Sequence, residues 1–287
     1  MTRSIGSIVG ILLWCVAFAA ETPLEFGADP ASAAWQFDGN RTSCRLTHEI
    51  PNFGEARFSQ EAGGNLAFDL SAWRIEMNDA IDVRIEAPAW LATYPHTELV
   101  GRVPARPPRD LAIDAPLAET MLRALYRGEQ PTFVTNDVSV SLSAVSFRPI
   151  YDAYARCVAQ LLPASFTQLE RSAIGFAPGK SQLDDAARSR LDLLADYVRA
   201  DHSIKRVQVD GHTDNSGRER KNRMLSEQRA KAVTEYLVAA GCDGEVIETH
   251  FHGSRFPVAS NDAQEGRALN RRVTIHLERQ RPKLATR

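Results

Sequence analysis

The sequence of 287 residues predicts an α+β protein, in which a β-rich domain with two helices precedes a mixed-sheet domain of βαβαββ order. The first half is dominated by period-two alternation of apolar and polar residues, whereas the second half alternates strand-like and helix-like patterns. The composition changes as well: all five lysines follow residue 165, and the net charge is −6 over residues 1–165 but +4 over residues 166–287. This change, at a stretch containing Pro and Ser, predicts a domain boundary near residues 163–165.

The first 19 residues have the pattern of a secretory signal peptide. Arg3 precedes a short apolar stretch over residues 8–18, and Ala17-Phe18-Ala19 fits the small-x-small rule for cleavage. Two alternatives stay open, namely an uncleaved anchor and acylation of Cys15, which is disfavoured because the large Trp14 precedes it. The expected organisation is a signal peptide at 1–19, a first domain at 20–163 and a second at 166–287, in an oxidising compartment.

Strands are expected in the first domain wherever alternating runs are bounded by Gly, Pro or Asn. The expected strands cover residues 42–48, 56–59, 65–70, 81–85 and 138–142. Two helices are expected, at 117–126 and 150–162, because apolar residues recur there with helical spacing. This half contains no paired carboxylates, metal-ligand spacing or nucleophile, so its residues are interpreted as packing.

The second domain is expected to contain four strands and two helices. The strands are expected at 173–177, 207–210, 248–252 and 272–277. The helices are expected to begin at residue 184 and to cover 222–240, each with an apolar face. This order predicts helices packed on one face of a mixed sheet.

The most informative stretch is GHTDNSGRERKNRMLSEQRAKAV, at residues 211–233. Asp214 follows a strand in a turn, and Asn222, Ser226 and Arg229 form a polar stripe on the next helix. An arginine at the edge of a core needs an anionic partner, and Asp214 is the obvious candidate. A carboxylate beside a guanidinium suits a zwitterionic ligand, because one binds an ammonium and the other a carboxylate. The alternative is a purely structural salt bridge.

Residues 213–233 fit the pattern T-D-x-x-G followed by N-x-x-L-S-x-x-R-A-x-x-V, and residues 270–273 read N-R-R-V. Over roughly residues 170–280 the chain therefore resembles the OmpA-like peptidoglycan-binding domain. The resemblance implies that Asp214 binds the free amine, and Arg229 the carboxylate, of diaminopimelate in the peptide stem.

The same resemblance implies further contacts with the stem. Hydrogen bonds are expected from Asn222 and from the backbone of Thr213, and Leu225 and Ser226 are expected to line the pocket. One position departs from the family, because many members carry Asp directly after the phenylalanine of the first strand and this chain has Ala177. Only the backbone amide of Ala177 could serve there, so a lower affinity is expected.

The first domain also resembles a known family, over W-Q-F at 35–37, C-R-L at 44–46, I-P-N-F-G-E-A-R-F at 50–58 and A-G-G at 62–64. These residues resemble the N-terminal domain of the MotY family of flagellar motor proteins. The resemblance implies a multi-copy periplasmic ring around the flagellar basal body in a Gram-negative bacterium. The first domain would contact the ring and a MotX-like partner, and the second would hold the stator complex to peptidoglycan.

The mature chain has three cysteines, which allow at most one disulfide. The MotY resemblance implies that Cys44 and Cys157 form it. These residues lie 113 positions apart, so the bridge would stabilise the fold by roughly 4–5 kcal/mol in the chain-entropy description. Cys242, after Gly241 at a helix end, is expected to be a free thiol. The alternative is that all three cysteines are reduced.

Other functions fit the sequence less well. The net charge of −2 argues against a nucleic-acid-binding protein. A metal-dependent hydrolase could use His212 with Asp214 and His250 with His252, but residues two apart on a strand share a face for ordinary packing reasons. No G-x-S-x-G motif or glycine-rich phosphate loop is present. We therefore expect no enzymatic activity, cofactor or metal, and the remaining alternative is a general envelope anchor unrelated to the flagellum.

Overall fold

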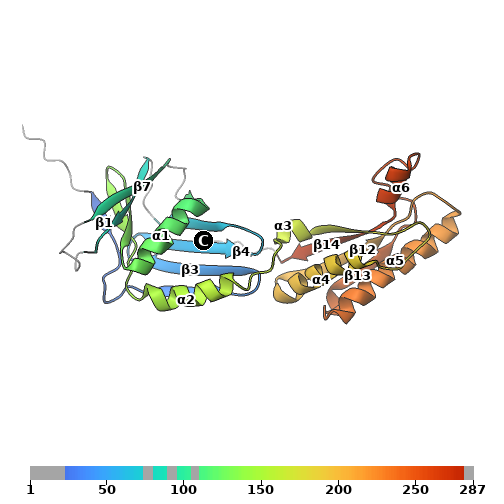
Figure 1. Cartoon of the computed structure of the whole chain (residues 1–287), viewed down its shortest axis with the longest axis horizontal. Helices are drawn as coiled ribbons and strands as arrows, with labels where there is room; N and C mark the ends of the chain where they lie inside the picture. Colours follow the sequence, from blue (N-terminus) through green and yellow to red (C-terminus); the bar gives the residue numbers. More distant parts are fainter. Residues whose placement is uncertain (1–22, 74–79, 89–95, 105–109, 281–287) are drawn as a thin grey trace, which may run out of the picture.

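The computed structural model describes residues 23–73, 80–88, 96–104 and 110–280, so the predicted signal peptide lies outside the described residues. The described chain forms two bodies placed end to end (Figure 1). A separate buried apolar core fills each body. The first body is rich in strands and the second is a mixed sheet with helices, which confirms the predicted α+β fold class.

The first body contains two five-stranded sheets. One sheet has the order β1-β10-β9-β6-β7, with strands at Leu24–Phe26, Val138–Ser141, Gln130–Val134, Ile81–Glu86 and Thr97–Val103. The other has the order β2-β3-β4-β5-β8, with strands at Trp35–Gly39, Ser43–Ile50, Gly54–Glu61, Leu66–Ala72 and Asp110–Ile113. Helices α1 (Ala115–Arg127) and α2 (Phe147–Val158) pack against these sheets.

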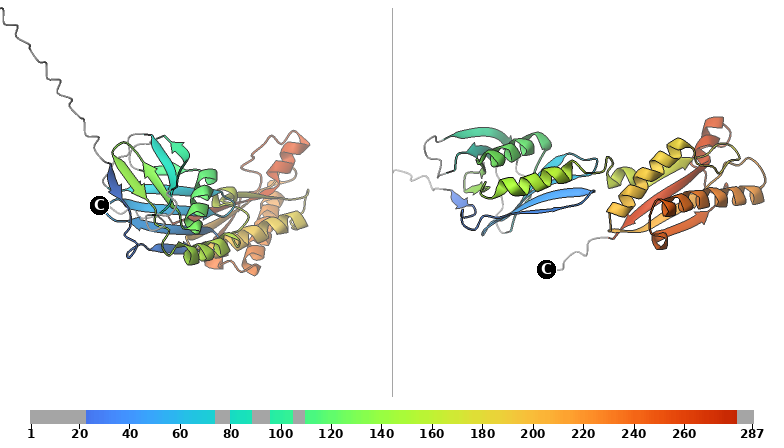
Figure 2. Two further views of the ribbon diagram at one scale, coloured as in Figure 1. Left: turned by 60° about the vertical axis from the view of Figure 1, so that its left-hand side comes forward. Right: turned by 60° about the horizontal axis from the view of Figure 1, so that its bottom comes forward.

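The second body is a four-stranded sheet with the order β11-β14-β12-β13. Its strands are β11 (Arg171–Gly175), β12 (Ile204–Gly211), β13 (Ile247–Phe251) and β14 (Arg272–Arg279), and only β12 and β13 run parallel. Helices α4 (Asp185–Ala200) and α5 (Glu219–Ala239) lie together along the sheet (Figure 2). Alternate residues of β12 are buried beneath them, whereas the other face of the sheet is polar.

Three short helices complete the second body. These are α3 (Phe166–Leu169), a 3-10 turn at Gly244–Val246 and α6 (Gln264–Asn270), which lies between β13 and β14. Strand β11 begins and ends two residues before the predicted strand at 173–177. The difference matters because Ala177 then lies in a turn, where its carbonyl oxygen accepts a hydrogen bond from the Lys180 N–H at 3.1 Å.

The two bodies meet at the hairpin tip between β4 and β5. The Gly63 N–H donates to the Leu162 carbonyl oxygen at 3.1 Å, and the Leu162 N–H donates to the Arg41 carbonyl oxygen at 2.9 Å. Ala62, at the same tip, is fully buried in the core of the second body. Leu162 thus bonds through both its N–H and its carbonyl oxygen to residues outside α2. The chain therefore leaves the helix before residue 162, and α2 ends at Val158 and not at the predicted residue 162.

Candidate ligand-binding site

The predicted site lies where β12 ends and α5 begins. Gly211, the last residue of β12, lies directly against α5, and a Cβ atom there would be only 2.1 Å from the Ser226 carbonyl oxygen. The absence of a side chain thus lets the helix approach the end of the strand. Residues 212–218 connect the two elements, and Gly217 has a φ of 100° that favours glycine.

Asp214 is held in this connection by two hydrogen bonds. Its Oδ2 atom lies 3.1 Å from Nη1 of Arg271, and its Oδ1 atom accepts from the Ser216 N–H at 3.0 Å. Nδ2 of Asn222 donates to the Asp214 backbone carbonyl at 3.3 Å. The Asp214 and Arg271 side chains are only 12% and 11% exposed, so the pair is largely desolvated.

Arg229 is completely buried and does not form the predicted ion pair with Asp214. Its guanidinium donates to three backbone carbonyl oxygens, those of Lys180 at 2.8 Å, His212 at 2.9 Å and Ala177 at 3.2 Å. The expectation of Asp214 as its direct partner was wrong because the turn after β11 supplies carbonyl oxygens that the sequence pattern does not reveal.

The charge of Arg229 is nevertheless retained. Burial, opposed by the charge of Asp214 and reinforced by that of Arg271, lowers the pKa of its guanidinium from 12.5 to about 10, so the group is positive at neutral pH. A guanidinium has five N–H donors, and three of them are used here. Within the described residues, Nη1 and Nη2 each keep one N–H without an acceptor, which is the number needed to bind a carboxylate through both oxygens.

A cavity of about 540 Å³ opens above these groups. Five of the predicted residues line it: Thr213, Asp214, Asn222, Leu225 and Arg229. The other lining residues are Pro178, Gly179, Ser216, Gly217, Gln264, Arg267 and Arg271. The lining includes one carboxylate and three guanidinium groups, so the cavity has a net positive charge and one negative centre.

Two of the predicted residues do not line this cavity. Ser226 is fully buried, where its Oγ atom accepts from the Gly253 N–H at 3.0 Å and donates to the Arg223 carbonyl at 2.8 Å. Ser226 therefore fastens the chain after β13 to α5. Ala177 instead contributes its carbonyl oxygen to Arg229, while its N–H has no acceptor among the described residues.

Part of the Thr213 backbone, from which a hydrogen bond to the ligand is expected, already has a partner. Its N–H donates to the Gly253 carbonyl oxygen at 2.9 Å, so the expected hydrogen bond would have to come from the carbonyl oxygen. Its hydroxyl, by contrast, is buried without a hydrogen-bond partner among the described residues, and the residue lines the cavity. The hydroxyl is thus a further polar group of Thr213 whose hydrogen-bonding capacity is unused among the described residues.

Sequence reasoning missed the α6 side of the cavity, including Gln264, Arg267 and Arg271. Nη1 of Arg267 donates to the carbonyl oxygens of Asn261 and Asp262 at 2.7 and 2.9 Å, which fixes the preceding loop. The N-R-R-V motif was a usable signal for Arg271, because it recurs with the rest of the family pattern.

The histidines near the site are arranged differently from a metal centre. His212 stacks on His252 with ring centroids 5.1 Å apart, and Nε2 of His252 lies 2.8 Å from Oδ1 of Asp210. Within the part of the chain that the structure describes, no three His, Cys, Asp or Glu side chains are grouped so as to hold a metal ion.

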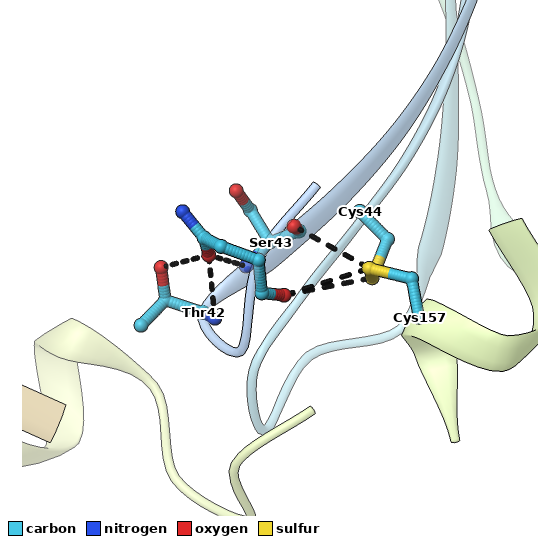
Figure 3. Close-up of a disulfide and its surroundings, with 5 residues drawn as sticks. Thr42, Ser43, Cys44 and Cys157 are labelled. Atoms are coloured by element: carbon cyan, nitrogen blue, oxygen red, sulfur yellow. Dashed lines mark hydrogen bonds between the residues drawn. A yellow bond between two sulfur atoms is a disulfide. The ribbon is translucent and has the colours of Figure 1, made fainter. Parts of the chain in front are cut away.

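The first body contains a disulfide between Cys44 and Cys157 (Figure 3). It joins β3 to the last turn of α2 across 113 residues of sequence, as the MotY resemblance implied. Cys242 is a buried free thiol.

Comparison with known proteins accounts for both bodies. Residues 26–163 match the MotY N-terminal domain, and residues 175–271 match the OmpA family. The sodium-type flagellar protein MotY of Vibrio parahaemolyticus is 31% identical over 264 residues, which cover 88% of this chain and 89% of that protein. The chain belongs to the MotY family. This confirms the resemblance of the first domain to that family.

Other similar proteins cover a smaller share of the chain. The peptidoglycan-binding protein ArfA of Mycobacterium tuberculosis is 39% identical over 139 residues, covering 48% of this chain and 35% of ArfA. Among solved structures, the cell wall anchor of the Pseudomonas aeruginosa T6SS is 32% identical and covers 38% of this chain and 82% of its own, with a TM-score of 0.33.

Proposed function

We propose that this member of the MotY family anchors the flagellar motor to peptidoglycan by binding diaminopimelate of the stem peptide in the cavity beside α5. Membership of the family supports a role in the flagellar motor, and the OmpA-family domain supports binding of peptidoglycan. The observation that carries the proposal is the presence of the Asp214 carboxylate and two unused N–H groups of Arg229 in one cavity.

The binding mechanism follows from the charges of the cavity. The ammonium group of diaminopimelate would contact Asp214, which keeps lone pairs beyond those used by Arg271 and Ser216. The carboxylate of the same amino acid would accept the remaining N–H groups of Arg229. The unpaired Thr213 hydroxyl would add a hydrogen bond, and Leu225 would contact the apolar part of the side chain.

The function is one of attachment and not of turnover. A single pocket that bound its ligand with micromolar affinity would contribute about 8 kcal/mol. Several copies in a ring would add avidity without new contacts, because each further binding event is intramolecular.

The protein would act in the periplasm at the flagellar basal body, with the first body facing a MotX-like partner and the stator complex. No described helix has the length and apolar character needed to cross a membrane.

Peptidoglycan pull-down tests the pocket. Asp214→Asn and Arg229→Ala should abolish sedimentation with purified sacculi, while Glu235→Gln and Arg190→Ala, at exposed positions on α5 and α4, should sediment like the wild type. Circular dichroism of each variant shows whether its fold is intact. Full sedimentation of both folded pocket variants would overturn the proposed site.

A second experiment separates the flagellar role from that of a general envelope anchor. Cells that lack the protein should assemble normal numbers of filaments and fail to swim, as counted by electron microscopy and scored by cell tracking. Normal swimming with altered envelope integrity would instead support the general anchor.

A further inference from the structure

A second hollow, of about 330 Å³, lies beside the cavity already described. It is lined by Glu219 and Arg223 of α5, by Phe251 at the end of β13 and by residues 252–256, which follow β13. Nothing in the proposed diaminopimelate contacts uses these residues.

The two hollows share one wall. Thr213 lines the cavity and Gly253 lines the second hollow, and the Thr213 N–H donates to the Gly253 carbonyl oxygen at 2.9 Å. In α5, Asn222 faces the cavity and its neighbour Arg223 borders the second hollow. A peptide ligand bound in the cavity would therefore need only a few of its own residues to extend over this wall into the second hollow.

The second hollow combines aromatic rings with groups that can bind hydroxyls. Phe256 is 59% exposed, and an exposed aromatic ring of this kind can mark a ligand-binding surface. The Arg223 guanidinium lies 5.4 Å from the centre of the Phe251 ring and forms no ion pair among the described residues. An exposed ion pair between Arg255 and Glu219, with atoms 3.0 Å apart, supplies both donors and acceptors.

This hollow is held in a fixed shape. Ser226 accepts the Gly253 N–H at 3.0 Å, and Nη2 of Arg272 donates to the Phe256 carbonyl oxygen at 3.2 Å. The Phe256 ring also meets the His252 ring edge-on, with centroids 5.2 Å apart. The exposed ring is thus positioned before any ligand arrives, which lowers the entropic cost of binding.

We infer that the second hollow is a sugar-binding subsite, which takes the glycan to which the bound stem peptide is attached. The inference rests on the proposed function of the neighbouring cavity. A stem residue spans at most about 3.6 Å when extended, so the sugar attached two residues before diaminopimelate lies within roughly 10 Å of the cavity. A neutral sugar with hydroxyl and acetamide groups matches the lining, in which exposed aromatic surface lies beside unpaired donors and a surface ion pair.

Titration calorimetry with two ligands of the same stem tests the inference on the full mature chain. The ligands are a free tripeptide that ends in diaminopimelate and the corresponding disaccharide–tripeptide. The wild type should bind the disaccharide–tripeptide about 5–10-fold more tightly. Phe256→Ala should reduce this affinity to that of the tripeptide and leave tripeptide binding unchanged.

Val258→Ala is the matched control, because Val258 is 63% exposed on the same loop and does not line the hollow. It should bind both ligands like the wild type. Equal affinity of the wild type for the two ligands would overturn the subsite while leaving the diaminopimelate pocket in place. An equal loss of both affinities in Phe256→Ala would also overturn it, because it would show that the substitution disturbs the loop and the neighbouring cavity in general. Failure of the wild type to bind either ligand would overturn the proposed function as well.

Discussion

Nη1 of Arg271 lies 3.1 Å from Oδ2 of Asp214, and the two residues are 57 positions apart in the sequence. Arg271 also donates through Nε to the Phe176 carbonyl oxygen at 3.1 Å, so one guanidinium joins the turn after β11 to the turn after β12. It is this arginine, and not Arg229, that neutralises the carboxylate of the proposed site. The two N–H groups of Arg229 that have no acceptor among the described residues can then bind the carboxylate of a ligand.

Removing Arg271 should therefore leave an enclosed carboxylate without its partner. We expect Arg271→Met to lower the free energy of unfolding by about 1–3 kcal/mol, and we expect Asp214→Asn to cancel most of that loss in the double variant. Urea unfolding of the two single variants and the double variant measures this coupling. Additive effects of the two substitutions would show that the pair is not energetically coupled.

Arg229 should be irreplaceable even by lysine. A lysine ammonium cannot reach three carbonyl oxygens placed around a planar guanidinium, and it offers no fork to a ligand carboxylate. We expect Arg229→Lys to lower the free energy of unfolding by about 2–4 kcal/mol and to abolish peptidoglycan binding. Arg190→Lys, at an exposed position of α4, serves as the control in both assays. Wild-type binding by Arg229→Lys would mean that charge alone recognises the ligand.

The sequence predicted the residues of the site that lie close together in the chain, on the turn after β12 and on α5. It did not predict the residues that α6 contributes from farther along the chain. Asp214, Asn222, Leu225 and Arg229 lie on one turn and one helix, so their spacing along the chain already determines that they meet. The α6 side reaches the cavity only through tertiary packing, and α6 is a seven-residue helix without a clear apolar face in the sequence. Backbone carbonyl partners, such as those of Arg229, leave no trace in side-chain patterns.

The same reasoning explains which strands were predicted. Strand β5 has buried residues at every second position, and its alternation is visible in the sequence. Strand β9 has three consecutive buried residues, and β7 is largely exposed along its length, so neither shows a period of two. These strands are defined by their neighbours in the sheet and not by their own pattern.

The disulfide should stabilise the first body alone. Cys44→Ala combined with Cys157→Ala should lower its free energy of unfolding by about 2–5 kcal/mol, because the open chain gains conformational freedom when unfolded. All four tryptophans precede residue 91, so tryptophan fluorescence during urea unfolding follows this body. Sedimentation with sacculi should be unchanged in native buffer, and Cys242→Ala should leave the fluorescence transition in place. Loss of sacculus binding in the folded double variant would contradict this separation.

Gly63 should determine how firmly the two bodies are joined. Its φ of 64° disfavours other residues, and a Cβ atom there would lie 2.7 Å from the Ser165 nitrogen. We expect Gly63→Ala to displace the hairpin tip and to increase the rate of proteolytic cleavage near residues 159–165 several-fold. Gly128→Ala controls for the backbone effect, because Gly128 has a φ of 93° but no atoms within 4 Å of the added Cβ. Equal cleavage rates in the two variants would show that the tip does not brace the connection.

Acidification should destabilise the second body through His212. Burial, followed by the charges of Arg272 and His252 and opposed by Asp210, lowers the pKa of this imidazole from 6.5 to about 4. Between about pH 6.5 and pH 4 the unfolded chain therefore binds the proton more readily than the folded one. The free energy of unfolding should be highest above pH 6.5 and should fall by up to roughly 3 kcal/mol toward pH 4. Urea unfolding by circular dichroism at pH 7 and pH 5 should show a smaller loss in His212→Gln than in the wild type. The exposed His202→Gln should keep the wild-type loss, and an equal loss in His212→Gln would assign the pH dependence to other groups.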